Sequence, residues 1–146
     1  MPSRPILEII GDRGFHSAKP SISVRAVAHH LKEFNAGAVL VIDEESGSLL
    51  GICTERDLTF KVLAEGLDAN VTTVGEIMTH DPQTISPDKP FGHVLHLMFE
   101  GGFRHMPVVD PQGRPIGVVS ARDALGLDML KFRDELEFRE NVTEIL

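Results

Sequence analysis

Two short segments of the chain carry residue types that could together hold a phosphorylated nucleoside. A serine or threonine at the start of a helix leaves backbone N–H groups and the positive end of the helix dipole facing a phosphate oxygen. An aspartate one turn along can accept hydrogen bonds from both hydroxyls of a ribose. Both segments have this spacing, with an arginine between the two residues: Thr54, Arg56 and Asp57, then Ser120, Arg122 and Asp123.

The same spacing also has a purely structural interpretation. Ser/Thr-x-x-Asp resembles a capping box, in which the acidic side chain satisfies backbone N–H groups at a helix N-terminus. Because the motif occurs twice, each time after a glycine-containing strand and before an apolar helix, we favour the ligand interpretation, and one aspartate can serve both roles. Arg56 and Arg122 are either secondary phosphate ligands or solvated helix charges.

Positive charge is scarce in this chain, and Arg104-His105 is its clearest candidate for binding a phosphate. The 146 residues include 14 Lys and Arg against 22 Asp and Glu, which gives a formal charge of -8. An acidic protein that binds phosphorylated ligands must gather cations locally, and arginine suits phosphate geometry well. Met106 and Pro107 follow directly and are expected to form an apolar wall beside the cations.

The elements that position these residues are predicted by an internal repeat. One set of residues recurs at an offset of 67, and the segment 51–57 recurs at an offset of 66 as 117–123, so one deletion aligns the two halves. The recurring set is Pro20, Val24, Val27, Ala28, Leu31 and Asp43, matched by Pro87, Phe91, Val94, Leu95, Met98 and Asp110.

Each copy is expected to fold as strand, helix, strand, strand and helix. The spacing from Val24 to Phe34 is typical of an amphipathic helix, and the apolar runs 38–42 and 49–53 around a polar turn predict a buried hairpin. We therefore predict an α+β fold of two βαββα repeats, 6–66 and 80–130, packed with pseudo-twofold symmetry because one copy alone would bury too little surface. Segment 67–79 is a linker with a short helix, and 131–146 extends an amphipathic C-terminal helix.

These motifs together resemble tandem CBS domains, the paired module also called a Bateman module. The resemblance rests on both Ser/Thr-x-x-Asp junctions and on three further runs: Ile77-Met78-Thr79, Thr84-Ile85-Ser86-Pro87, and Phe103 to Asp110. It implies that AMP, ADP, ATP or NAD binds in clefts between the two repeats. It also places Arg104 and His105 beside the ligand.

The resemblance further implies that Thr84-Ile85 and Ser17-Ala18 form the adenine slots, and it makes the two sites unequal. Ser17-Ala18 lacks the β-branched residues usual there, and Gly37-Ala38-Val39 gives the first copy a neutral wall where the second has Arg104-His105. We expect tighter binding at a second site built from Thr84, Ile85, Arg104, His105, Ser120 and Asp123.

The expected function is that of an adenosine-nucleotide sensor that signals in trans to a regulated protein of unknown identity. Paired modules of this family commonly associate again, so we expect a homodimer. The alternative is a dimerisation scaffold with non-functional clefts. Catalysis is not expected, because no nucleophile stands beside a base in the sequence.

Composition excludes several other classes. The acidic charge disfavours nucleic-acid and membrane-surface binding, and no apolar run is long enough to span a bilayer. The single cysteine, Cys53, predicts an inert core thiol. The spacing of His93 and His96 permits joint metal ligation, but neither this pair nor His29-His30 has a partner Cys, Asp or Glu at a recognised metal spacing, so ordinary helix histidines are expected. With no secretory signal at its N-terminus, the chain is expected in the cytoplasm.

Overall fold

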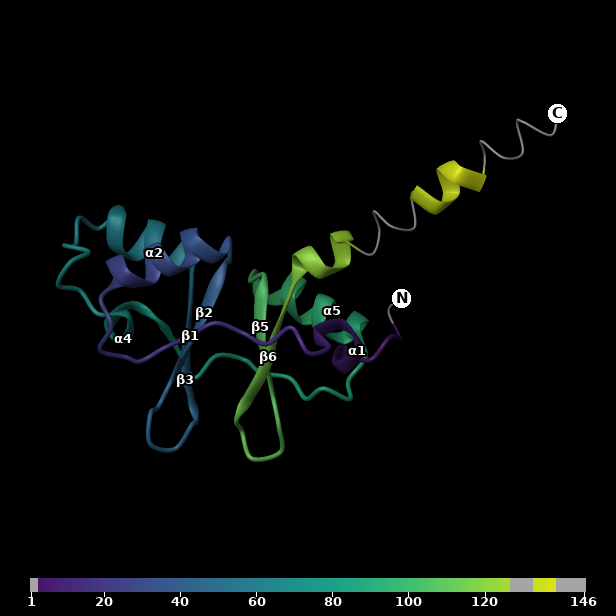
Figure 1. The fold of residues 1–146 in the computed structure, drawn as a ribbon, viewed down its shortest axis with the longest axis horizontal. Coiled ribbons are helices and arrows are strands. Elements are labelled where there is room, and N and C mark those ends of the chain that lie inside the picture. The colour runs from purple at the N-terminus through teal and green to yellow at the C-terminus, as the bar shows by residue number, and fades with distance from the viewer. Residues whose placement is uncertain (1–2, 127–132, 139–146) are drawn as a thin grey trace.

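The computed structural model describes residues 3–126 and 133–138, and its first repeat contains the predicted elements (Figure 1). Val24, Val27 and Leu31 lie on the buried face of its first long helix. That helix begins after Ser23, whose side chain accepts a hydrogen bond from a backbone N–H one turn on. The elements are β1 (Ser17–Ala18), α2 (Val24–Phe34), β2 (Ala38–Ile42), β3 (Leu49–Thr54), α3 (Glu55–Asp57) and the π-helical turn η1 (Leu58–Leu63).

The second repeat has the same order with a shorter first strand. The first repeat pairs β1 with β2 in parallel, through Ala18 and Val41. At the equivalent place the second repeat has a single parallel bridge between Ile85 and Val108. Its other elements are α5 (Phe91–Gly101), β5 (His105–Val109), β6 (Pro115–Ser120) and a helix over 121–126.

The two hairpins have matching registers. Val41 pairs with Gly51 in the first hairpin, Val108 pairs with Gly117 in the second, and each register shifts one residue further along. In Figure 1 the hairpins stand side by side and point the same way. The prediction of an α+β fold made of two such repeats is therefore confirmed.

The segment before the first strand of each repeat crosses over and packs on the other repeat. Helix α1 (Ile6–Ile10) lies on the second repeat, where the Ile6 N–H donates to the Lys89 carbonyl. Helix α4 (Val74–Ile77), the short helix predicted in the linker, lies on the first, where the Val74 N–H donates to the Ile22 carbonyl. After α4, strand β4 (Thr79–His80) joins the first sheet beside β3.

This exchange determines the composition of the cores. Ile6 and Ile10 are buried with the apolar residues of the second repeat, whereas Val74 and Ile77 are buried with those of the first. A third, smaller cluster joins Leu40 and its neighbours in the first sheet to residues outside that sheet, among them Val118 of β6. The repeats thus share apolar surface, which a single repeat of about sixty residues could not bury alone.

Two glycines leave room for the crossing segments. A Cβ atom on Gly51 would lie 2.6 Å from the carbonyl oxygen of Thr79. A Cβ atom on Gly117, at the equivalent place in β6, would lie 2.9 Å from the side chain of Ile10. Both distances are shorter than ordinary carbon contacts, so the absence of a side chain at these positions allows the crossing segment to lie directly on the strand.

The C-terminal part of the chain is helical where the structure describes it, over 121–126 and 133–138. Leu125, Leu136 and Phe138 of the predicted apolar stripe are exposed there. Met129, Phe132, Val142 and Ile145, which the prediction also placed on the stripe, lie outside the described residues. Among the helices of the described ranges, none is long and apolar enough to cross a membrane.

Candidate functional site

The first Ser/Thr-x-x-Asp junction forms the capping box that its spacing allows. Thr54 is the N-cap of α3, and its hydroxyl oxygen accepts a 3.3 Å hydrogen bond from the Asp57 N–H. In return Asp57 Oδ2 accepts 2.9 Å and 3.2 Å hydrogen bonds from the Thr54 N–H and hydroxyl. Asp57 Oδ1 lies 3.1 Å from Lys61 Nζ. The structural interpretation therefore holds, while Oδ1 has only a flexible lysine as its described partner.

The second junction has a similar contact and one important difference. The Ser120 N–H donates a 2.8 Å hydrogen bond to Asp123 Oδ2, as in a capping box. Asp123 also forms a 2.8 Å ion pair with Arg13, a residue 110 positions earlier in the chain. The cation at Asp57 therefore comes from η1, the turn that follows α3, whereas the cation at Asp123 comes from the crossing segment.

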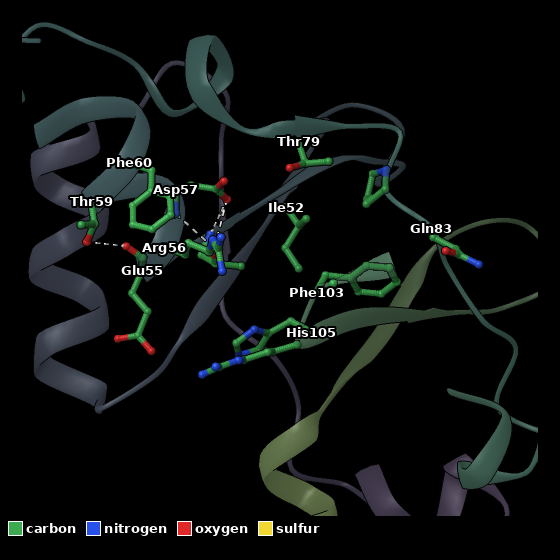
Figure 2. Close-up of a pocket in the computed structure, with 14 residues that line it drawn as sticks. Ile52, Glu55, Arg56, Asp57, Thr59, Phe60, Thr79, Gln83, Phe103 and His105 are labelled. Carbon is green, nitrogen blue, oxygen red and sulfur yellow. Dashed lines mark hydrogen bonds between the residues drawn. The ribbon is translucent and has the colours of Figure 1, made fainter. Parts of the chain in front are cut away.

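A cavity of about 560 Å³ opens beside the first junction (Figure 2). This volume is within the roughly 300–1,000 Å³ of small-molecule sites. Both repeats contribute to its lining. From the first come Ile52, Thr54, Glu55, Arg56, Asp57, Thr59 and Phe60, and from the crossing segment and the second come Thr79, Pro82, Gln83, Gly102, Phe103, Arg104 and His105.

The lining is chemically divided. Ile52, Phe60 and Phe103 offer apolar surface, on which a planar base could lie. Arg56 and Arg104 supply positive charge, and the Arg56 guanidinium lies 4.6 Å from the centre of the Phe60 ring, in a cation–π contact. An apolar surface next to cations and a helix N-terminus suits a ligand that combines a base with an anionic group.

His105 lies where the two repeats contact each other. It lies in β5 close to Gly37, where an added Cβ atom would come within 2.9 Å of its Nε2. Burial lowers the pKa of His105 below the ordinary 6.5, although the carboxylates of Glu55 and Asp123 act in the opposite direction. The ring is therefore held neutral more strongly than a free histidine, and an incoming anion would favour its protonation.

Five of the predicted site residues line this one cavity: Thr54, Arg56, Asp57, Arg104 and His105. The sequence groups Arg104 and His105 with the second junction, and His105 pairs with Ser120 across the β5–β6 hairpin. Both residues also line the cavity beside the first junction. The grouping with Ser120 and Asp123 stays a prediction. His105 is close enough to Asp123 for that carboxylate to affect its pKa.

The remaining predicted residues lie around the cavity or in the cores. Strand alternation sends the side chains of Val39 and Met106 into the two repeat cores, so neither forms a wall of the cavity. The other predicted residues lie as follows: Ser17 and Ala18 in β1, Gly37 before β2, Ala38 in β2 within the shared cluster, exposed Thr84, buried Ile85 bridged to β5, buried Pro107 in the middle of β5, and exposed Arg122 in the helix over 121–126.

Several lining residues were not predicted from the sequence. Thr79, Pro82 and Gln83 reach the cavity because their segment crosses between the repeats, a packing choice that the repeat offset does not show. Phe60 and Phe103 could have been found, since phenylalanine is the only aromatic residue besides histidine in a chain without Trp or Tyr.

Cys53 and the pair His16 and His30 do not line the described cavity. Cys53 is fully buried, and burial raises the pKa of its thiol to about 12, as expected for an inert core cysteine. His16 and His30 share a 2.9 Å contact between ring nitrogens. Across the residues that the structure describes, no group of three His, Cys, Asp or Glu side chains is arranged to hold a metal ion.

The fold and the cavity define a paired βαββα module with its candidate site between the repeats. Comparison with known families agrees, because the CBS domain matches residues 8–64 and again 74–129. The chain belongs to the CBS domain family and contains two copies of the domain.

Similar proteins include uncharacterised ones. Protein MK0525 of Methanopyrus kandleri is 30% identical over 137 residues, which cover 87% of this chain and 69% of that protein. The CBS domain-containing protein CBSCBSPB1 of Arabidopsis thaliana is 36% identical over 118 residues, 80% of this chain. The match spans only 21% of the Arabidopsis protein, about a fifth of its length.

Solved structures superpose on most of this chain. An uncharacterised conserved protein from Pyrococcus horikoshii superposes with a TM-score of 0.80 at 27% identity, covering 88% of this chain and 94% of that one. The CBS domain pair of protein MJ0100, solved in complex with 5'-methylthioadenosine and S-adenosyl-L-methionine, has a TM-score of 0.78 at 32% identity and covers 89% and 99%.

Proposed function

We propose that this chain is a regulatory module that binds an adenosine nucleotide, AMP, ADP, ATP or NAD, in the cavity between its repeats and acts in trans on another protein in the cytoplasm. The observation that carries the proposal is the composition of the cavity. One wall is the N-terminus of α3 with Asp57, and the other holds Arg104 and His105 beside Phe103. The MJ0100 domain pair, with its adenosine compounds, supports the adenosine part of the proposal.

Each part of such a ligand has a matching part of the cavity. In the proposed complex Asp57 Oδ1 would accept from ribose hydroxyls in place of Lys61, because Oδ2 is already engaged by the cap. Arg104 and Arg56 would neutralise phosphate, and the Phe103 and Ile52 side chains would cover the base. The proposed role is binding rather than catalysis.

The test is a thermal-shift and calorimetry panel of AMP, ADP, ATP, NAD, 5'-methylthioadenosine and S-adenosylmethionine. A ligand that binds only the folded chain, at about a hundred times its Kd, should add roughly 2.7 kcal/mol of stability. If none of the panel shifts the transition at millimolar concentration, the proposal is rejected.

The panel also separates the phosphate site from the base site. Arg104→Ala should weaken AMP by about tenfold, since it removes a charge-assisted contact. It should leave uncharged 5'-methylthioadenosine nearly unaffected. Equal weakening of both ligands would show that Arg104 positions the cavity rather than binding phosphate.

A second candidate function, a dimerisation scaffold, is favoured by apolar side chains on the helices. Leu63 of η1 is 77% exposed and Phe99 of α5 is 87% exposed, so both side chains offer apolar surface to a second copy. We propose a homodimer that covers such residues, whether or not the cavity binds a nucleotide. Light scattering should give twice the chain mass, and a monomer mass would reject the dimer.

A further inference from the structure

The second junction is already occupied by a side chain of the protein itself. Arg13 Nη1 lies 2.8 Å from Asp123 Oδ1, and Arg13 Nη2 lies 2.9 Å from Asp123 Oδ2. Nη2 also donates a 2.7 Å hydrogen bond to the Val118 carbonyl of β6. The Ser120 N–H also donates a 2.8 Å hydrogen bond to Asp123 Oδ2. Both oxygens of the carboxylate are therefore engaged, by a two-pronged contact of the kind that arginine makes most strongly.

The position of Arg13 follows from the crossing of the N-terminal segment. Ile10 is buried in the second core and rests against Gly117, which fixes the chain just before Arg13. Gly11 and Gly14 flank the arginine with positive φ values of 50° and 69°, conformations that other residues rarely adopt. The backbone is thus bent on both sides of Arg13, and the bend brings its guanidinium to Asp123.

The first junction has no such occupant from its crossing segment. The residue 67 positions after Arg13 is His80, which lies in β4 opposite Gly51 and is exposed. The described cation at Asp57 is Lys61 of η1, which contacts one carboxylate oxygen, donates a 3.0 Å hydrogen bond to the Ile77 carbonyl and is 44% exposed. It does not make the two-pronged contact that Arg13 makes with Asp123, and a lysine side chain can move aside without any change in the backbone.

We propose that Arg13 blocks nucleoside binding at the second cleft, the space beside Ser120 and Asp123. Its guanidinium occupies both oxygens of the Asp123 carboxylate, so a nucleoside can bind there only by displacing Arg13. The inference rests on the proposed function, because it takes Asp123 to be the ribose-binding counterpart of Asp57. As a consequence, the parent chain should bind one nucleotide, at the Asp57 cavity, while Arg13 remains paired with Asp123.

The experiment is a calorimetric titration of AMP into the full chain and into Arg13→Ala, with Arg13→Gln as a second variant of similar shape. The parent chain should bind one equivalent, which Asp57→Ala abolishes. Arg13→Ala should bind two, with the second site at least about tenfold tighter than in the parent because the competing occupant is gone. Adding Asp123→Ala to Arg13→Ala should remove that second site.

Arg4→Ala is the matched control. Arg4 is another arginine of the N-terminal segment, is 40% exposed against 43% for Arg13, and pairs with Glu8 instead of a junction residue. This variant should behave as the parent does, with one equivalent bound. A second site in Arg4→Ala would mean that charge removal alone, and not release of Asp123, opens the cleft, and would overturn the inference.

The other outcomes separate the two proposals. If the parent binds one equivalent and Arg13→Ala still binds one, Arg13 does not close the cleft and only the function at Asp57 survives. If the parent binds two equivalents, or if Arg13→Ala loses affinity, the inference is overturned, because Arg13 then tolerates or assists the ligand. If the parent binds none and Arg13→Ala binds one through Asp123, the Asp57 proposal fails and the inference stands. No binding in any variant rejects both.

Discussion

Removing the Asp57 side chain tests whether this residue is a cap, a ligand or both. In Asp57→Ala the Thr54 N–H loses its acceptor, and loss of a cap costs about 0.5–2 kcal/mol. The Lys61 contact adds about 0–1 kcal/mol, since the lysine is largely exposed. A total near 1–2 kcal/mol should lower Tm by roughly 3–6 °C in a chain of this size.

The effect on nucleotide binding should be larger than the effect on stability. A carboxylate that accepts from two ribose hydroxyls makes charge-assisted hydrogen bonds worth about 1.5–3 kcal/mol each. Loss of even one corresponds to a Kd raised by about tenfold or more. Calorimetry with AMP measures this change, and a thermal melt without ligand measures the cap.

Ser23→Ala is the matched control for this prediction. The Ser23 side chain caps α2 by accepting from the Ala26 N–H at 3.2 Å, and it does not line the cavity. Its removal should lower Tm to a similar extent and leave the Kd unchanged. If Asp57→Ala also leaves the Kd unchanged, the Ser/Thr-x-x-Asp motif is only a cap here and the ribose assignment is refuted.

Three further predictions follow from burial and packing. Burial lowers the pKa of His105 below 6.5, so the unfolded chain takes up the histidine proton before the folded chain does as pH falls. The free energy of unfolding should therefore be constant with respect to this group above about pH 6.5 and decline below it. In urea titrations at several pH values, His105→Phe should reduce that decline. Gly51→Ala should destabilise by about 1–3 kcal/mol because Thr79 must move, whereas Gly126→Ala, with open space around it, should not; equal melts would refute the crossing contact. Cys53 should react with a thiol reagent only at the rate of unfolding, and fast labelling of the native chain would contradict its burial.

Much of the local structure could be predicted from the sequence. The spacing of Val24, Val27 and Leu31 predicted the buried face of α2, and the apolar runs around a polar turn predicted both hairpins. The capping residue Thr54 predicted where α3 begins, at Glu55. These features depend on residues close together in the chain, and their periodicity is set by the geometry of helices and strands.

The repeat in the sequence also determined that the chain has two halves, each with one Ser/Thr-x-x-Asp junction. It could not determine which half each flanking segment would cover. The apolar residues of α1 and α4 fit either repeat by hydrophobicity alone, because burial is non-directional. Only the tertiary structure decided that the two segments exchange, with Ile10 against Gly117 and Thr79 against Gly51.

That exchange decides the surroundings of the two junctions. It brings Gln83 to the cavity at Asp57, which Arg104 of the second repeat also lines. It also carries Arg13 to Asp123, a contact over 110 residues that no local pattern could indicate. The sequence by itself determined which residue types are available for a nucleotide, and the packing of the crossing segments determined which of them meet, because a carboxylate pairs with whichever cation the fold brings within reach.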